Sequence, residues 1–306
     1  MRTVWIGILL IILGLGISIF AVSLIVSYLF VLPNRSSYEE TFFSGIKNGE
    51  IVDDVFQSHD KEELFLTSAD GCRLHAMFFP VPDSRKAVMI THGIKWSLFG
   101  GYKYVELFQS LGYHVLLCDS RCHGLSGGSH VSYGFYEKND LALWADELEH
   151  KLGKDVFIGV LGESLGAAAA VELMKQDRRI QFCIADSCFS DLTELCRHQL
   201  KGVVKLAVPL LIPLISRLIK RRHGWSLADI SPVRNLEQTD TPLFIIHGKN
   251  DQLVPPQMAE RLYEKKKGVK KLYLIEGAGH VGGFRQNPEE YFRKVQDFLL
   301  RVEPVK

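Results

Sequence analysis

A serine between two glycines is the strongest chemical signal in this chain. Residues 162–166 read Gly-Glu-Ser-Leu-Gly, with the apolar run 156–161 before them and four alanines, 167–170, after them. A strand that enters a helix through this pattern must turn sharply, and the flanking glycines permit the close backbone approach. The turn exposes the serine hydroxyl at a helix N-terminus, where free N–H groups and the positive end of the helix dipole face outward. The pattern predicts that Ser164 is a nucleophile.

A serine nucleophile needs a base, and the base needs an acid that orients it. Of the eleven histidines, His280 is best placed, because it lies in a glycine-rich loop between the last predicted strand and the last predicted helix. Asp251 follows the strand predicted at 243–246 and is the predicted acid, with Asp186 as a second candidate. The order Ser164, Asp251, His280 is the nucleophile–acid–base order of α/β-hydrolases.

Acyl transfer also needs N–H groups that stabilise a tetrahedral oxyanion, each worth roughly 3–4 kcal/mol of the barrier. The position of the serine turn makes the backbone N–H of Leu165 one predicted donor. A second is expected from Ile94, in the Thr-His-Gly-Ile run at 91–94, because Gly93 permits a tight turn after a strand. The neighbouring His92 is interpreted as a brace for this loop and not as a base.

A second polar run, with Asp119, Arg121 and His123, follows the strand predicted at 114–119. These residues could form a catalytic cluster, but an ion pair and glycine turns that hold a loop explain them better. The six cysteines show no paired metal spacing, and no histidine context marks one as a nucleophile. The sequence therefore predicts no metal site.

Eight short apolar segments are predicted strands, at 63–67, 73–80, 87–91, 114–119, 156–161, 182–186, 242–247 and 271–276. Segments with helical periodicity separate most of them, and an amphipathic helix is predicted at 289–301. This alternation predicts an α/β fold with a mostly parallel, doubly wound sheet of about eight strands and active loops at the carboxyl ends of the strands. The first two strands are close enough in sequence to form a hairpin at one edge.

The N-terminus is almost wholly apolar from residue 4 to residue 32, and no charged residue occurs between positions 3 and 34. At about 1.5 Å per residue this stretch exceeds the ~30 Å hydrocarbon core of a bilayer. A cleaved signal peptide would have a shorter apolar region and a small-residue cleavage site, whereas bulky residues end this run. We predict an uncleaved, single-pass anchor in the cell membrane. Positive charges flank it almost equally, so the face that carries the catalytic domain stays open.

The predicted organisation is a transmembrane anchor at 1–34, a polar juxtamembrane connector at 35–60 and a hydrolase domain at 61–306. An insert at about 199–231 interrupts the alternation with an apolar run, 206–215, and a basic cluster. Its two prolines, Pro209 and Pro213, are expected to exclude a regular helix. The insert is interpreted as a small apolar cap over the site, as packing against the main domain, or as a segment in the membrane interface.

Several motifs together carry a family resemblance. They are Thr-His-Gly at 91–93, the Asp-x-Arg-x-His-Gly-x-Ser-x-Gly run at 119–128, and residues 132–141, 162–166, 247–251, 261–267 and 279–280. From about residue 60 the chain resembles the α/β-hydrolase superfamily, in its serine aminopeptidase-like and acylaminoacyl-peptidase-like branch. It looks most like the membrane-anchored bacterial hydrolases of the YqkD type. The resemblance implies that Ser164, Asp251 and His280 form a catalytic triad and that hydrolysis of an ester, thioester or amide needs no cofactor.

We therefore expect a membrane-anchored serine hydrolase that cleaves a carboxylic ester or thioester with a hydrophobic acyl group through an acyl-enzyme. The expected partners are a small-molecule or lipid acyl substrate and the membrane. The net charge of +1 gives no electrostatic case for nucleic acid. One alternative is a serine peptidase of the aminopeptidase-like type, although the sequence shows no charged anchor for a peptide terminus. Another is a non-catalytic, membrane-tethered binding scaffold.

Overall fold

One eight-stranded sheet organises the protein, in the order β1-β2-β4-β3-β5-β6-β7-β8. The computed structural model describes residues 2–32, 35–204 and 207–303. The strands are β1 (Glu62–Thr67), β2 (Arg73–Phe79), β3 (Lys86–Thr91), β4 (His114–Asp119), β5 (Phe157–Glu163), β6 (Ile180–Asp186), β7 (Leu243–Gly248) and β8 (Lys270–Ile275). The first two strands form an antiparallel hairpin at one edge, β2 is also antiparallel to β4, and all other neighbours are parallel. The predicted α/β fold is therefore confirmed.

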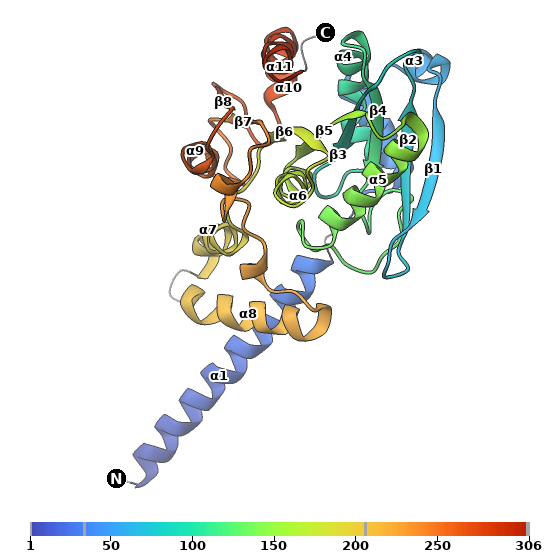
Figure 1. Cartoon of the computed structure of the whole chain (residues 1–306). Coiled ribbons are helices and arrows are strands. Elements are labelled where there is room, and N and C mark those ends of the chain that lie inside the picture. The colour runs from blue at the N-terminus through green and yellow to red at the C-terminus, as the bar shows by residue number, and fades with distance from the viewer. Residues whose placement is uncertain (1, 33–34, 205–206, 304–306) are drawn as a thin grey trace.

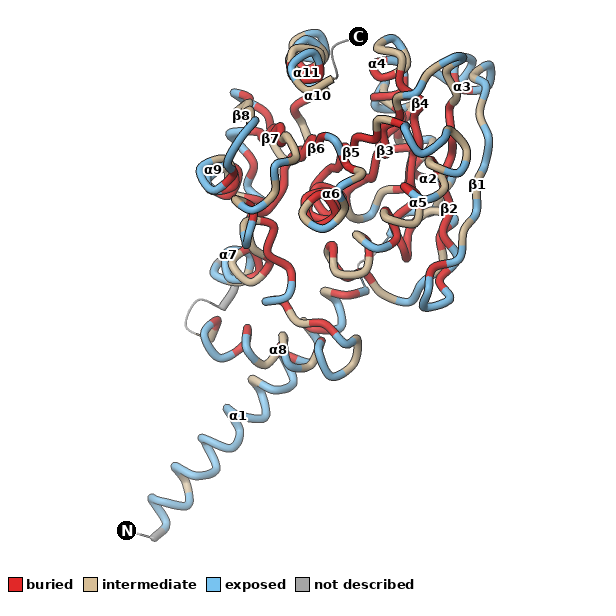
Figure 2. Tube along the Cα trace, in the orientation of Figure 1, coloured by how far each residue is buried: buried red, intermediate tan, exposed pale blue. Residues whose placement is uncertain are grey.

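Helices cover both faces of this sheet, because strand side chains alternate between two apolar cores. One core contains side chains of α5 (Glu137–Leu152), α6 (Leu165–Met174) and α9 (Pro256–Lys265). The other contains those of the 3₁₀-helix η1 (Leu98–Tyr104), α4 (Val105–Ser110) and α11 (Pro288–Val302). Buried residues concentrate in the central strands and in α6, as Figure 2 shows. The remaining short elements are η2 (Leu227–Asp229), η3 (Leu236–Gln238) and α10 (Gly283–Gln286).

Two helices occupy the segment predicted as a polar connector, α2 (Tyr38–Lys47) and α3 (Asp53–Ser58). The first has a capping box: Ser37 Oγ accepts from the Glu40 N–H at 3.1 Å, and the Glu40 carboxylate accepts from the Ser37 N–H at 2.7 Å. In α3, Phe56 is buried in the second core. The segment is thus helical and packed onto the domain. The predicted domain boundaries themselves stay a prediction, and residues 33–34 at the end of the anchor lie outside the described residues.

The predicted insert contains the end of α7 (Leu192–Val204) and all of α8 (Val208–His223). The expectation that its prolines exclude a helix was wrong. Pro209 lies in the first turn of α8, where a backbone N–H needs no helical partner, and Pro213 removes only one bond from the interior. Burial of apolar side chains, among them Ile215 and Ile219, stabilises α8 despite that loss. Residues 205–206 lie outside the described residues.

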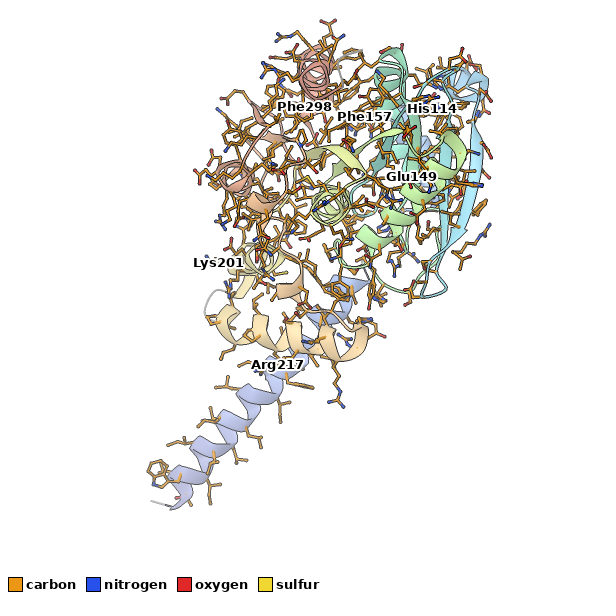
Figure 3. All side chains as sticks on the ribbon, viewed as in Figure 1. His114, Glu149, Phe157, Lys201, Arg217 and Phe298 are labelled. Carbon is orange, nitrogen blue, oxygen red and sulfur yellow. The ribbon has the colours of Figure 1, made fainter. Side chains whose placement is uncertain are left out.

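A single long helix, α1 (Arg2–Val31), extends away from the body of the protein, and α8 crosses it (Figure 1). Residues 3–22 are exposed apart from Gly7 and Ile19, which are partly exposed. Ser23, Ser27 and Val31, by contrast, are buried. Figure 3 shows the side chains of the outer part projecting freely, and it labels Arg217 on α8 near the crossing. The helix is therefore a candidate membrane span whose last turns belong to the folded domain.

Candidate active site

Ser164 stands at the apex of a strained turn between β5 and α6. Its φ of +53° lies in the left-handed region, which a side chain rarely adopts without support from its surroundings. A Cβ on Gly162 would lie 2.3 Å from the carbonyl oxygen of Gly166, and a Cβ on Gly166 would lie 2.4 Å from that of Thr91. Both glycines are therefore required by backbone contact. The turn has the geometry that the Gly-Glu-Ser-Leu-Gly pattern predicts.

The structure brings Ser164, His280 and Asp251 together in one hydrogen-bonded series. Because β5, β7 and β8 are parallel, the loops after them meet at the same edge of the sheet. His280 Nε2 lies 2.8 Å from Ser164 Oγ, and His280 Nδ1 lies 2.7 Å from Asp251 Oδ2. A carboxylate only accepts, so Nδ1 donates to Asp251, which leaves Nε2 to accept the serine proton. The imidazole is about one-fifth exposed, which leaves it accessible from the site.

Asp251 is held as a buried carboxylate. Its Oδ1 accepts from the backbone N–H groups of Leu253 at 2.9 Å and Val254 at 2.8 Å. The His247 ring, fully buried, places Nε2 at 3.3 Å from Oδ2. Burial alone would raise the pKa of Asp251, but hydrogen bonds from His247 and His280 hold that pKa below its usual range. Asp251 therefore stays ionised at neutral pH. His247 is part of this support.

The two predicted oxyanion donors, Leu165 and Ile94, line the same cavity as Ser164. Leu165 is the first residue of α6, where the opening N–H groups have no intrahelical partner. Ile94 follows Gly93, on which a Cβ would lie 3.3 Å from that of the serine. His92 Nδ1 donates to the Gly93 carbonyl at 2.7 Å, and burial lowers its pKa, as expected for a neutral brace. The roles of both N–H groups stay predictions.

The polar run after β4 holds its loop in place, as the sequence suggested, and its partners lie on other elements of the fold. Asp119 accepts from His75 Nδ1 at 2.7 Å, on β2. Arg121 pairs with Asp140 at 2.7 Å and with Asp70 at 3.0 Å. These contacts tie the loop to α5 and to the edge hairpin. In the contacts that the structure describes, none of these groups reaches Ser164 or His280.

Asp186, the second candidate acid, is linked to the loop of His280 through Ser187. Its carboxylate accepts from Ser187 Oγ at 2.9 Å and from the Tyr291 hydroxyl at 3.0 Å. Ser187 Oγ in turn accepts from the backbone N–H of Val281, at 3.0 Å, next to His280. Asp186 therefore holds the loop that carries His280, while Asp251 contacts the ring of His280. The sequence reveals neither Ser187 nor Tyr291, because both are specified only by packing between β6 and α11.

Two cavities meet at Ser164. The first, of about 390 Å³, has a mostly apolar lining: Val26, Leu29, Phe30, Ile94, Lys95, Tyr133, Ser164, Leu165, Phe189, Leu195, Gln199, Leu253 and Val254. The second, of about 300 Å³, is more polar and includes His280. It also contains two cations that are already paired: Lys103 with Glu163 at 2.7 Å and Arg285 with Glu50 at 2.9 Å. The sequence does not indicate that α1 lines the first cavity, because no pattern of neighbouring residues distinguishes a cavity wall from a membrane span.

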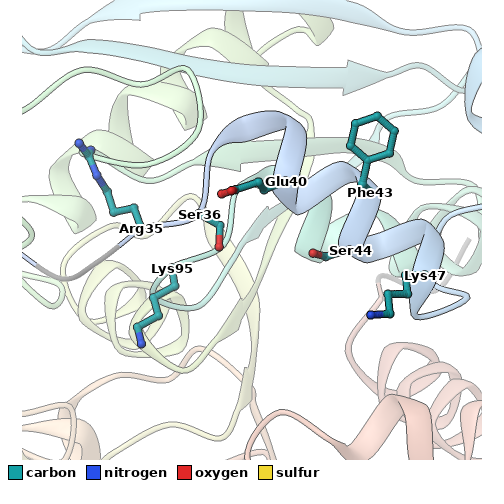
Figure 4. A pocket seen from close by; sticks show the side chains of 7 residues that line it. All are labelled: Arg35, Ser36, Glu40, Phe43, Ser44, Lys47 and Lys95. Atoms are coloured by element: carbon teal, nitrogen blue, oxygen red, sulfur yellow. The ribbon is translucent and has the colours of Figure 1, made fainter.

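A broad, open groove of about 780 Å³ lies beside these cavities, between α2 and the loop after β3 (Figure 4). Arg35, Lys47 and Lys95 give it a basic lining, opposed by Glu40. Lys95 lines this groove and both cavities at Ser164. The approach to the site is therefore basic on one side and apolar on the other.

Comparison with known proteins agrees with the geometry. The model of the prolyl oligopeptidase family matches residues 102–303. The uncharacterized protein YqkD of Bacillus subtilis is 32% identical over 294 residues, which cover 95% of this chain and 96% of YqkD. The uncharacterized protein YfhR of Escherichia coli K12 is 26% identical, over 78% of this chain and 80% of YfhR.

Solved structures show the same fold. An esterase of Pyrococcus furiosus, Pf2001, superposes with a TM-score of 0.67 at 26% identity, covering 83% of this chain and 95% of the esterase. An acylaminoacyl peptidase superposes with a TM-score of 0.62 at 14% identity, covering 82% of this chain and 44% of the peptidase. The second likeness concerns the fold alone.

Proposed function

This chain belongs to the prolyl oligopeptidase family of α/β-hydrolases, and from that premise we propose that it is a membrane-anchored serine hydrolase. Its proposed substrate is a carboxylic ester or thioester with a hydrophobic acyl group, cleaved through an acyl-enzyme. The observation that carries the proposal is the series Ser164, His280 and Asp251, with contacts of 2.8 and 2.7 Å, at the wall of an apolar cavity.

In the proposed mechanism Ser164 Oγ attacks the acyl carbon while His280 Nε2 accepts its proton. Asp251 keeps the imidazole in the tautomer that can accept, and it stabilises the imidazolium that forms. The N–H groups of Leu165 and Ile94 stabilise the oxyanion. His280 then returns the proton to the leaving alcohol or thiol, and a water molecule activated by the same base releases the acid from the acyl-enzyme.

The lining of the apolar cavity supports an acyl ester as the substrate. In the polar cavity Lys103 and Arg285 are paired with Glu163 and Glu50, whereas Lys95, which lines both cavities, has no ion pair among the described contacts. The apolar cavity, in contrast, offers aliphatic and aromatic side chains to an acyl chain, whose burial contributes about 0.8 kcal/mol per CH₂.

The membrane anchor is proposed on the exposed, apolar surface of α1. In lipid these apolar side chains would be removed from water, and the backbone N–H and C=O groups would be hydrogen-bonded within the helix. An N-terminal signal sequence has the same composition, so the proposal depends on whether α1 is retained.

A fluorophosphonate probe tests the catalytic assignment directly, because it reacts only with an activated serine. We expect the full-length, detergent-solubilised protein to be labelled, and Ser164→Ala to lose the label completely. Ser129→Ala, at an exposed serine, is the matched control and should label like the wild type. Absence of labelling in a folded wild type would instead support a non-catalytic scaffold.

A further inference from the structure

The last turns of α1 are part of the hydrolase domain and not merely its tether. Val31 is 1% exposed and belongs to the main apolar core. Its carbonyl accepts from the backbone N–H of Val131 at 3.0 Å. One turn earlier, Ser27 accepts from the guanidinium of Arg222 on α8, which fastens the helix from a second side. The end of the helix is therefore fixed in position relative to the domain.

A pair of stacked rings connects this end to the catalytic turn. The rings of Phe30 and Tyr133 lie 4.4 Å apart and nearly parallel, and the Tyr133 hydroxyl donates to the Phe30 carbonyl at 3.0 Å. Tyr133 also packs against the small cluster that contains Leu165 and Val131, and Ile94 packs there too. Contact thus runs without interruption from α1 to both predicted oxyanion donors.

Three side chains of α1 line the apolar cavity at Ser164: Val26, Leu29 and Phe30. Leu29 is 67% exposed, so it forms the rim of the cavity and not its floor. Leu195 of α7 lines the same cavity. An acyl chain in this cavity would therefore contact both α1 and α7.

The position of this rim can be related to a bilayer. Trp5 and Tyr28 are 65% and 56% exposed, as expected for aromatic residues at the two membrane interfaces. They are separated by about 35 Å of helix, close to the ~30 Å hydrocarbon core. Arg222 lies 5.1 Å from the Tyr28 ring, where it can also meet lipid headgroups. In a bilayer bounded by these two aromatic residues, Leu29 would lie at the boundary of headgroups and acyl chains, the depth at which lipids carry their ester bonds.

We propose that α1 is a specificity-determining wall of the active site and that the substrate is a fatty acyl ester of a membrane lipid, which reaches Ser164 laterally from the bilayer. This inference rests on the proposed function. A bond forms between Ser164 Oγ and the acyl carbon, the ester C–O bond breaks, and the lipid alcohol leaves with the proton that His280 carried. Water then replaces the serine, which releases a fatty acid and restores the proton to Ser164.

The first test compares two leucine substitutions on the same helix. Leu29→Trp narrows the rim, whereas Leu24→Trp introduces the same bulk five residues earlier, about 140° around the axis and away from the cavity. Turnover of p-nitrophenyl esters from two to twelve carbons is measured for the full-length protein in detergent micelles. For Leu29→Trp we expect the ratio of kcat/KM on the dodecanoyl ester to kcat/KM on the acetyl ester to fall roughly tenfold or more. Leu24→Trp should keep the profile of the wild type.

Identical profiles for the two variants would overturn the role of α1, while wild-type activity on the acetyl ester would leave the proposed function standing. Failure of the wild type to cleave any ester would instead reject the proposed function. Fluorophosphonate labelling of Leu29→Trp shows that its site is folded. Leu29→Ala, which widens the rim, gives an independent variant and should shift the preference toward longer chains.

The second test distinguishes a lipid source from a soluble one. The full-length protein is reconstituted into phosphatidylcholine vesicles that contain a fluorogenic phospholipid ester, and release of the labelled fatty acid is followed. We expect release that Leu29→Trp reduces and Leu24→Trp does not. Hydrolysis of micellar and soluble esters without any release from vesicles would overturn lateral entry.

Discussion

At the scale of single residues, Asp251 and Asp186 hold His280 in place through different contacts. Asp251 contacts the imidazole of His280, and Asp186 holds the neighbouring backbone through Ser187. The first contact sets the tautomer and the second sets the position of the loop. Substitution of each should therefore reduce activity to a different extent.

Asp251→Asn is expected to lower kcat on a short p-nitrophenyl ester by about 10⁴-fold, because an amide favours the wrong tautomer of the base. Asp186→Asn should cost far less, since it leaves the contact with the ring intact. Steady-state kinetics of the two purified variants show which carboxylate contributes more to kcat. A larger loss for Asp186→Asn would reverse the assignment of the acid.

The pH dependence of stability should report the same carboxylate. The pKa of Asp251 is lower in the folded protein than the value of about 3.9 in an unfolded chain. Its contribution to stability is therefore complete above about pH 4 and is lost as the pH falls toward the folded pKa. We expect urea midpoints of wild type and Asp251→Asn to differ at pH 7 and to converge below pH 4. A difference that persists into acid would argue against an ionised Asp251.

The convergence of Ser164, Asp251 and His280 could be predicted from the sequence because each follows a strand of a parallel sheet. Such loops meet at one edge whatever the details of packing. The supports of Asp186 could not be predicted in this way, because Tyr291 reaches it from a distant helix. The position of Leu29 at the cavity could not be predicted for the same reason: its apolar neighbours in sequence indicate a membrane span, and only tertiary contact places it beside Ser164.

At the scale of elements, the turn from β5 to α6 depends on backbone contacts that side chains would prevent. Gly166 packs against the end of β3, and Gly162 packs against Gly166 itself. The strained φ of Ser164 persists because these neighbours leave it no other conformation.

In α8, the sequence-based prediction overestimated how strongly Pro213 would disrupt a helix. The buried face of that helix outweighs one missing hydrogen bond.

Gly166→Ala should destabilise the protein by roughly 1–3 kcal/mol or more, since the new Cβ would lie 2.4 Å from a backbone oxygen in β3. The matched control is Gly279→Ala, where the structure places no atom within 4 Å of a new Cβ. Urea unfolding of both variants in detergent measures the difference. Equal stability of the two would show that the close approach at the turn is not required.

At the scale of the whole molecule, α1 divides into an outer part and a docked part. The outer part, residues 3–22, is about 30 Å long and almost wholly exposed. The docked part ends at Val31, in the apolar core of the domain. Removal of α1 as a signal peptide would therefore expose part of the apolar core and remove one wall of the cavity at Ser164.

We expect the mature protein to retain its N-terminus. A chain with different epitope tags at its two ends, expressed in a bacterial host, should give one band that carries both tags. That band should stay with the membranes after extraction at alkaline pH. A shorter band with the C-terminal tag alone, released as a soluble protein, would contradict the anchor.

The docking of α1 also has a mechanical consequence. A transmembrane helix answers a thicker or thinner bilayer by changing its tilt, at a modest cost per ångström. Here the end of that helix is stacked on Tyr133 and bonded to Val131, so it cannot swing freely as a flexible tether would. A change of tilt must bend α1 near Ser23 or displace Leu29 at the rim. For an α1 that spans the bilayer as proposed, a change in bilayer thickness would be transmitted along the helix to Leu29 at the mouth of the cavity, and lipid composition would then affect turnover.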